Sequence, residues 1–121
     1  MALDGAGQAK VDTLVSAGGM LQRVHGMVER YALAVKQQQV VGSLQLQIKR
    51  ALEPMVGLLK PQFGIVADQV TQVILAMGRG GSDNTRVRTL REGVAQVRSA
   101  LEIVERQVRE QHAKEVPVAP E

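Results

Sequence analysis

The sequence predicts an all-α protein: an elongated antiparallel three-helix bundle with a proline-kinked middle helix, with a four-helix bundle as the alternative. Hydrophobic residues make up 45% of the 121-residue chain, but only Tyr31 and Phe63 are aromatic, whereas sandwiches and barrels usually draw on aromatic strand residues. Apolar residues recur at alternating spacings of three and four over long stretches, which is typical of helices that pack lengthwise. The length corresponds to one domain.

The first expected helix covers residues 8–39 and follows a glycine-containing segment, residues 1–7, that we expect to be disordered. Its apolar seam consists of Leu14, Ala17, Leu21, Val24, Val28, Tyr31 and Val35. Met20 and Met27 flank the seam on one side and small residues flank it on the other, so a neighbouring helix can approach closely. Glycines at 18, 19 and 26 each cost about 1 kcal/mol of helix propensity relative to alanine, so this helix depends on tertiary packing.

The middle expected helix covers residues 43–78, with Gly42 and Ser43 marking its start. Residues 44–48 alternate as in a strand, but no other segment offers a partner strand. Pro54 and Pro61 each remove a helix hydrogen bond, yet the apolar seam continues across both with a phase slip near residues 59–63. Either one long helix is broken near residues 54–61, or two shorter helices meet with Pro61 in the first turn of the second. We favour one helix, because a rod of about 50 Å matches the first helix in length.

The last expected helix covers residues 86–112 and has the clearest pattern. Its seam holds three-four spacing over three heptads, through Val87, Leu90, Val94, Val97, Leu101, Val104 and Val108. Gly93 and Ala100 widen this seam into a face for two neighbouring helices, which favours a bundle over a two-stranded coiled coil. We expect Thr85, after the loop that starts at Gly78, to be its N-cap. Residues 113–121 contain two prolines and are expected to form a flexible tail, which leaves 8–112 as the single domain.

No motif in the chain predicts catalysis, a metal or a cofactor. The absence of cysteine excludes thiolate chemistry. His25 and Glu29 have helical spacing but lack further ligands, so we interpret His25 as a core-edge residue that bonds to Glu29 or the backbone. Val28 and Glu29 also stand where histidine phosphotransfer domains have a basic and a small residue, so that resemblance is rejected. We therefore expect no enzyme and no small-molecule substrate.

The arginines around the glycine loop form the first candidate site. The loop lacks the Lys-Ser/Thr ending of a Walker loop, although its glycines allow backbone N–H groups to approach an anion. We assign no acidic partner to Arg79, Arg86 or Arg91, and the helix dipole disfavours cations in first turns. The residues expected to bind an anionic partner are Arg79, Arg86, Arg88 and Arg91. Neutralisation by Asp83 and solvent is the alternative.

The second candidate site is an apolar surface beside the main seams. Residues in such positions that form a continuous exposed patch mark an interface, and methionine adapts well to such surfaces. The residues concerned are Met20, Met27, Leu46, Val56, Leu58, Ile74 and Ile103. The alternative is that a single wide-faced monomer core buries them.

These two surfaces give two hypotheses of function. The first is a non-enzymatic interaction protein, an adaptor, scaffold or chaperone-like subunit that forms homo-oligomers or binds a protein partner through apolar helix faces. The alternative is a basic accessory subunit that binds nucleic-acid phosphates through Arg79–Arg91, with Lys49, Arg50 and Lys60. A net charge of +3 is compatible with a polyanion but does not require one.

The sequence also predicts where the protein resides. Residues 1–10 lack the basic and apolar regions of a secretory signal. The longest apolar candidate, residues 63–77, is interrupted by Asp68, Gln69 and Gln72 and cannot span a membrane. We therefore expect a cytoplasmic protein without a membrane partner.

Overall fold

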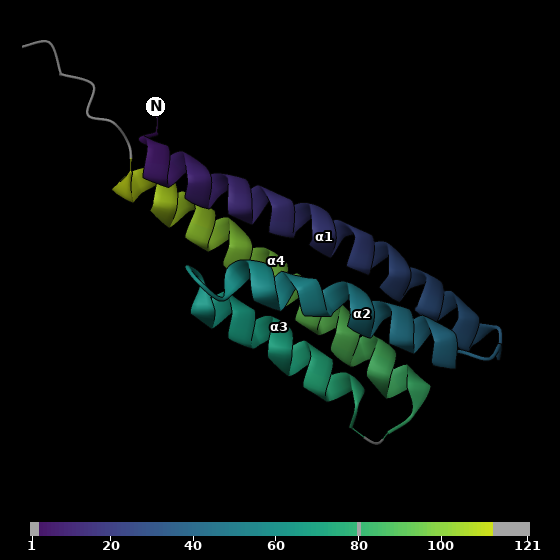
Figure 1. Cartoon of the computed structure of the whole chain (residues 1–121). Coiled ribbons are helices and arrows are strands. Elements are labelled where there is room, and N and C mark those ends of the chain that lie inside the picture. Colours follow the sequence, from purple (N-terminus) through teal and green to yellow (C-terminus); the bar gives the residue numbers. More distant parts are fainter. Residues whose placement is uncertain (1–2, 80, 113–121) are drawn as a thin grey trace, which may run out of the picture.

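Four stretches of three-four periodicity form four α-helices in the computed structural model, which describes residues 3–79 and 81–112. The helices are α1 (Gly5–Lys36), α2 (Gly42–Leu59), α3 (Gly64–Met77) and α4 (Asp83–Gln111), and this part of the chain contains no β-strand. They run alternately up and down (Figure 1). α1 and α3 each pack against α2 and α4, so the four helices occupy the corners of a square bundle. The expected all-α class is confirmed.

The middle segment forms two helices, so the expected three-helix bundle is wrong and the four-helix alternative has the observed helix number. Pro54 stands inside α2 without ending it. The break comes at Pro61, after which the N–H groups of Gln62 and Phe63 both donate to the carbonyl of Leu59, at 3.3 and 2.7 Å. Phe63 leaves helical geometry (φ −132°, ψ 56°) and its side chain is buried. The apolar seam therefore changes phase near residues 59–63 because the chain reverses direction there.

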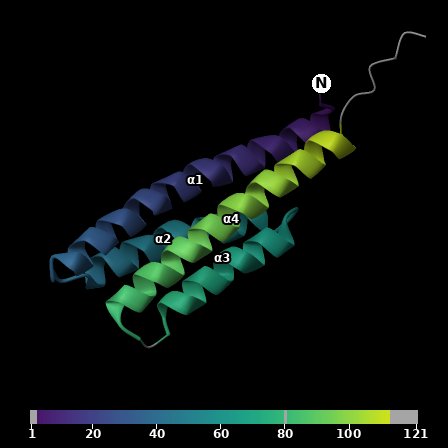
Figure 2. The ribbon, with the colours of Figure 1, turned by 180° about the vertical axis from the view of Figure 1, so that it is seen from behind.

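The reversal gives the bundle two long and two short helices. With 32 and 29 residues, α1 and α4 are about 48 and 44 Å long, whereas α2 and α3, with 18 and 14 residues, reach only about 27 and 21 Å. Both views show α1 and α4 side by side, extending beyond the α2–α3 hairpin at the end where the chain begins (Figures 1 and 2). Matching the middle segment to α1 by length is therefore misleading, because the segment folds back on itself.

The boundaries of α1 differ from the expected ones at both ends because of local hydrogen bonds. α1 begins at Gly5, inside the segment expected to be disordered, since the Asp4 carboxylate accepts the Gly7 N–H at 2.6 Å as an N-cap. It ends at Lys36 because Gln38 is left-handed (φ 57°). The N–H groups of Gln38 and Gln39 then donate back to the carbonyls of Val35 and Ala34, as in a Schellman motif.

The α4 helix begins three residues earlier than expected. Ser82, and not Thr85, is its N-cap, and the Ser82 Oγ accepts the Thr85 N–H at 3.1 Å. Asp83 therefore lies in the first turn, where the helix dipole favours an acidic group. The flexible tail expected at 113–121 lies outside the described residues.

The seams meet in one aliphatic core. Most predicted seam residues are buried, although Val35 and Val104 are only partly so, and the described residues bury no polar or charged side chain. The largest fully buried side chains are Tyr31, Leu21, Ile48, Leu52, Met55, Leu59, Leu90, Val24, Val28, Val70 and Val97. Such a core is held by non-directional burial, so polar contacts at its edges have to fix how the helices meet.

Gly93 of α4 and the three glycines in the interior of α1 have different roles. At Gly93 of α4 an added Cβ would lie 2.6 Å from Val73 Cγ2 of α3, so this glycine permits the close approach of the two helices, as its place beside the seam predicts. At Gly18, Gly19 and Gly26 of α1 an added Cβ meets nothing within 4 Å. The close neighbour expected beside the small flanking residues is therefore not found at Gly18 among the described residues.

We predict opposite effects for alanine at these two kinds of glycine. Gly93→Ala forces a methyl group into Val73 and is expected to lower the free energy of unfolding by about 1–3 kcal/mol. Gly26→Ala adds a methyl group in open space and is expected to raise it by up to about 1 kcal/mol through helix propensity. Urea unfolding followed by circular dichroism measures both. A Gly93→Ala variant at least as stable as wild type would contradict the close α3–α4 packing.

Candidate functional site

Arg86, expected to bind an anion, contacts the protein itself. Its Nη1 donates to Asp83 Oδ1 at 2.9 Å, and only 17% of its side chain is exposed. Its Nε and Nη2 donate to the carbonyl oxygens of Met77 and Arg79 at 3.2 and 3.3 Å. The guanidinium therefore satisfies carbonyls at the C-terminal end of α3 and is neutralised by Asp83. Asp83 lies three residues before Arg86, so this arginine follows the alternative that the sequence left open, neutralisation by Asp83.

The Asp83 carboxylate joins three helices at this end of the bundle. Its Oδ1 accepts from the Tyr31 hydroxyl of α1 at 2.9 Å and from the Gln45 amide of α2 at 3.3 Å, besides Arg86 of α4. The Gln45 amide also donates to the Tyr31 oxygen at 2.9 Å. Since the Arg86 side chain continues to α3, all four helices are connected through this polar cluster.

Arg91 is also paired, with a residue far away in the sequence. Its Nε and Nη2 donate to the two carboxylate oxygens of Glu29 at 3.1 and 2.8 Å, which links α4 to α1. The hydrogen bond from Arg91 lowers the pKa of Glu29 below its ordinary value. The partners are 62 residues apart, so helical spacing gives no sign of the pair. Of the four candidate arginines, Arg79 and Arg88 are exposed and form no ion pair within the described ranges.

A small pocket of about 170 Å³ lies between the α3–α4 loop and the first turns of α4. Its lining includes Arg79 and Arg86 and the hydroxyl-bearing residues Ser82, Thr85 and Thr89. Such a lining suits a small oxyanion in hydrogen-bonding terms. The charge of Arg86, however, is already balanced by Asp83 at 2.9 Å. Arg79 alone is left to supply a net positive charge from this lining.

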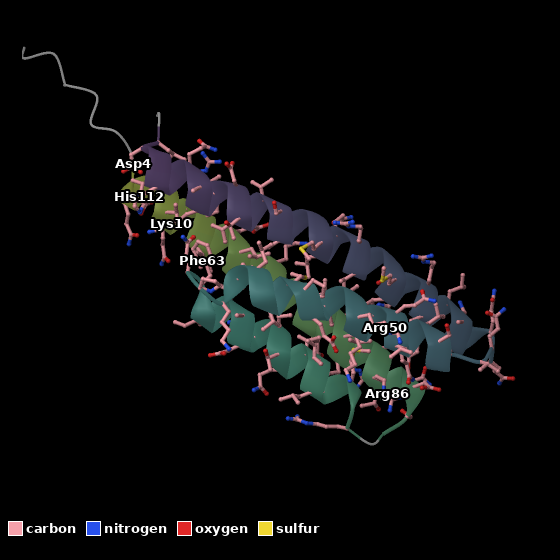
Figure 3. The ribbon with its side chains drawn as sticks, viewed as in Figure 1. Asp4, Lys10, Arg50, Phe63, Arg86 and His112 are labelled. Carbon is pink, nitrogen blue, oxygen red and sulfur yellow. The ribbon has the colours of Figure 1, made fainter. Side chains whose placement is uncertain are left out.

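A second polar cluster lies at the opposite end, where the first turn of α1 meets the last turn of α4. Figure 3 shows Asp4, Lys10 and His112 gathered there, with Arg86 at the far end of the bundle. His112 Nδ1 lies 3.2 Å from Asp4 Oδ1, its Nε2 lies 3.0 Å from Lys10 Nζ, and the Asp4 N–H donates to the His112 carbonyl at 3.2 Å. In a catalytic site the second ring nitrogen of the histidine would face a nucleophile, whereas Nε2 of His112 faces the Lys10 amino group. We interpret this cluster as a structural contact that holds the start of α1 against the end of α4.

The described part of the chain also offers no metal site. It contains no group of three or more His, Cys, Asp or Glu side chains placed to hold a metal ion. Glu29, which the sequence places one helical turn after His25, is bonded to Arg91 instead.

The predicted apolar surface divides into buried and exposed parts. Two of its seven residues, Leu46 and Ile103, are exposed, at 46% and 51%. The others are partly buried and pack against the core: Met20, Met27, Val56, Leu58 and Ile74. Each helix of a four-helix bundle has two neighbours, so a stripe wider than one seam is buried. Five exposed apolar residues were not predicted as interface: Val15, Leu33, Val40, Ile65 and Leu75.

Exposed and half-buried apolar side chains meet in a groove between α2 and α3. The groove has a volume of about 420 Å³ and is lined by Leu46 and Lys49 of α2 and by Ile74 and Leu75 of α3. Leu46 and Leu75 are 46% and 53% exposed. The structure therefore brings together two of the predicted interface residues, Leu46 and Ile74, and adds Leu75. This groove is the candidate functional site.

Comparison of the chain with protein-family models, with curated proteins and with solved structures finds no match in any of the three. Among the described helices, none is long and apolar enough to cross a membrane. The candidate site therefore has to be interpreted from its own residues.

We predict that Arg86 stabilises the fold and that Arg88 does not. Arg86→Met removes the bonds to Asp83 and to the α3 carbonyls and is expected to lower the free energy of unfolding by about 2 kcal/mol. Arg88→Met, at an exposed position two residues on, is the matched control and should change it by less than about 0.5 kcal/mol. Urea denaturation of both variants measures the difference. Equal effects would show that Arg86 is not a structural clamp.

We predict that Asp4 makes stability depend on pH in the acidic range. The Gly7 N–H, followed by His112 and Lys10, lowers the pKa of Asp4 from its ordinary value of 3.8. The ionised carboxylate is thus favoured in the folded state, so its contribution is present above pH 3.8 and is lost as the pH falls through the lower folded pKa. Asp4→Asn should therefore melt below wild type at pH 7, and this difference should shrink between about pH 4 and pH 2.

Thermal melting followed by circular dichroism, in steps of pH, measures this difference. Asp12→Asn, at an exposed position of the same helix, serves as the control for removing one carboxylate charge from α1. If the Asp4→Asn difference stays constant across the acidic range, the lowered pKa is wrong.

Proposed function

We propose that this chain is a non-enzymatic interaction module that binds a protein partner through the outer face of the α2–α3 hairpin. We call this surface the α2–α3 face; the exposed side chains at its groove are Leu46, Lys49 and Leu75. The observation that carries the proposal is the pair of exposed leucines, Leu46 and Leu75, on the rims of one apolar groove.

The face combines features that protein interfaces share. Its groove is lined by Leu46, Ile74, Leu75 and Met77 together with Gln45 and Lys49. The apolar side chains gain about 25 cal/mol for each Å² of apolar surface removed from water. Leu46 and Leu75, 46% and 53% exposed, lie on its two sides. Charged residues surround these positions, which matches the apolar centre and polar rim of protein interfaces.

The grooves on the opposite side of the bundle, formed by α1 and α4, have more charged residues in their linings than the α2–α3 groove. Its groove near Val15 has Arg98, Glu102 and Glu105 in the lining, and the larger groove at the other end has Glu29 and Arg91. A partner on this side would have to remove these charges from water, which costs free energy unless each gains a new partner.

Phosphate binding through Arg79–Arg91 is the second candidate function, and the loop pocket between Arg79 and Arg86 favours it. The net positive charge of Arg79–Arg91 is reduced because Arg86 and Arg91 form ion pairs with Asp83 and Glu29. The remaining exposed cations near it would give only a few phosphate contacts and thus weak, strongly salt-dependent binding.

We predict that the α2–α3 face contacts protein in the cell. A photo-crosslinking amino acid at Leu75 should yield covalent adducts with a protein, whether a different chain or a second copy of this one. The same amino acid at Ser99, an exposed position on α4, is the control and should yield at least about fivefold less adduct if the face is specific. Analysis of the adducts by mass identifies the partner class.

Adducts with nucleic acid at Leu75, or equal yields at both positions, would contradict the proposed function. Binding of DNA and RNA, titrated at low and moderate salt, tests the second candidate function. Affinity that is lost after charge reversal at Arg79 and Arg88 would support it, and absence of binding at low salt would remove it.

A further inference from the structure

The His112 ring, at the end of α4, lies between two groups of opposite charge on α1. Its Nδ1 is 3.2 and 3.3 Å from the two carboxylate oxygens of Asp4, and its Nε2 is 3.0 Å from the Lys10 Nζ. Only 20% of the His112 side chain is exposed. The ring comes this close to α1 because residue 7 is glycine, where an added Cβ would collide with the Cβ of His112. Both ring nitrogens are therefore in contact with charged groups of α1.

These two contacts together require one form of the ring. An ammonium group has three donors and no acceptor, so the Nε2 that faces Lys10 has to accept and carries no proton. The Gly7 N–H, followed by His112 and Lys10, lowers the pKa of Asp4 from its ordinary value of 3.8, so this carboxylate is ionised near neutral pH and Nδ1 has to donate to it. The contacts thus fit the neutral imidazole with its proton on Nδ1.

We infer that His112 is a proton-operated switch in the contact between α1 and α4. Neutral, the ring binds Asp4 and Lys10 together; protonated, it keeps Asp4 and releases Lys10. Histidine ordinarily changes charge between about pH 5 and pH 8. The added proton makes Nε2 a donor, so two groups of like charge would face each other at 3.0 Å, and the flexible lysine side chain moves away.

Each charged group at the ring favours one of these two states. Asp4 favours the imidazolium, as does the C-terminal end of α4, where the helix dipole attracts a cation. Lys10 favours the neutral ring. On α4 itself, Arg109 is paired with Glu105 at 3.7 Å, and the hydrogen bonds and ion pairs of the described residues bring no charged group of α2 or α3 to the ring. Release of Lys10 therefore accompanies a stronger Asp4 pair, and the two helices stay joined.

The switch also decides where the Lys10 charge lies. Lys10 is in the lining of a groove of about 270 Å³, with Phe63, Val104 and Val108. Figure 3 shows Lys10 beside His112, with Phe63 next along the bundle. The described lining of this groove contains no acidic residue, so protonation of His112 frees a cation at its edge. The inference goes beyond the proposed function, since it concerns this end of the bundle and not the α2–α3 face.

Thermal melting at two pH values tests the switch. The Lys10 contact exists only while His112 is neutral, so it stabilises the fold at pH 8 and is lost as the pH falls through the titration of the ring. Lys10→Met, which keeps helix propensity, should lower the melting temperature by about 2–4 °C at pH 8 and by less than about 1 °C at pH 5. Circular dichroism follows the melting.

His112→Gln is the matched background for this measurement. An amide at this position can accept from Lys10 and donate to Asp4 but takes up no proton in this range, so Lys10→Met should then have the same effect at both pH values. His25→Gln removes the other histidine of the chain and should leave the pH dependence of the Lys10→Met effect unchanged. An effect of Lys10→Met that is equal at pH 8 and pH 5 in wild type, or that still depends on pH in the His112→Gln background, overturns the switch.

Nuclear magnetic resonance of the wild type tests the ring form without any substitution. Correlations between the ring protons and ring nitrogens should show His112 at pH 8 with its proton on Nδ1 and none on Nε2. Nuclear Overhauser contacts between the ring and the Lys10 side chain should be present at pH 8 and lost at pH 5, while the hydrogen bond from the Asp4 N–H to the His112 carbonyl persists at both. A proton on Nε2 at pH 8, or Lys10 contacts that remain once the ring is charged, overturns the inference.

Discussion

The chain reversal at residues 60–63 is the constraint on which the rest of the structure depends. Pro61 interrupts the hydrogen bonds of α2, and Phe63 buries its side chain while its N–H donates to Leu59. The middle segment therefore becomes two short helices that fill two corners of a square bundle. This adds interior space and explains why flanking residues such as Met20 and Met27 pack against the core. It also creates the α2–α3 face, which a single straight middle helix would not present.

The sequence was sufficient to predict what depends on local periodicity. The seams, the all-α class and the second neighbour of α4 at Gly93 follow from spacing, because a helix brings residues three and four apart onto one face. The number of helices does not follow, since the phase slip near residues 59–63 fits both a kink and a reversal. The partners of the candidate arginines do not follow from the sequence for a related reason: Arg91 binds Glu29 across 62 residues, and no local pattern reports a contact between distant turns. Leu46 and Ile74 of the candidate groove were predicted, whereas Leu75 was not.

The two polar clusters that join several side chains lie at opposite ends of the bundle, and this arrangement suits an aliphatic core. Burial of Val, Leu and Ile favours compact packing but has little directional preference, so sliding of one helix along another costs little by itself. Tyr31, Gln45 and Arg86 meet at the Asp83 carboxylate at one end, and Asp4, Lys10 and His112 meet at the other. Hydrogen bonds lose their value beyond narrow distances and angles. The two clusters therefore fix the longitudinal positions of helices that the core alone would leave free.

The weakness of α1 as an isolated helix gives these end contacts further importance. Gly18, Gly19 and Gly26 each cost about 1 kcal/mol relative to alanine, and no side chain or backbone of the described structure uses the space they leave. The helix is therefore held by its buried seam and by fixed points near its ends: the Asp4 cap with His112, and the contacts of Tyr31 and Glu29 with α4. α2 and α3 lack side-chain N-caps and are joined by the short turn that contains Pro61. The long α1–α4 pair thus acts as the frame of the bundle, and the hairpin that it supports presents a groove with Leu46, Ile74 and Leu75 in its lining.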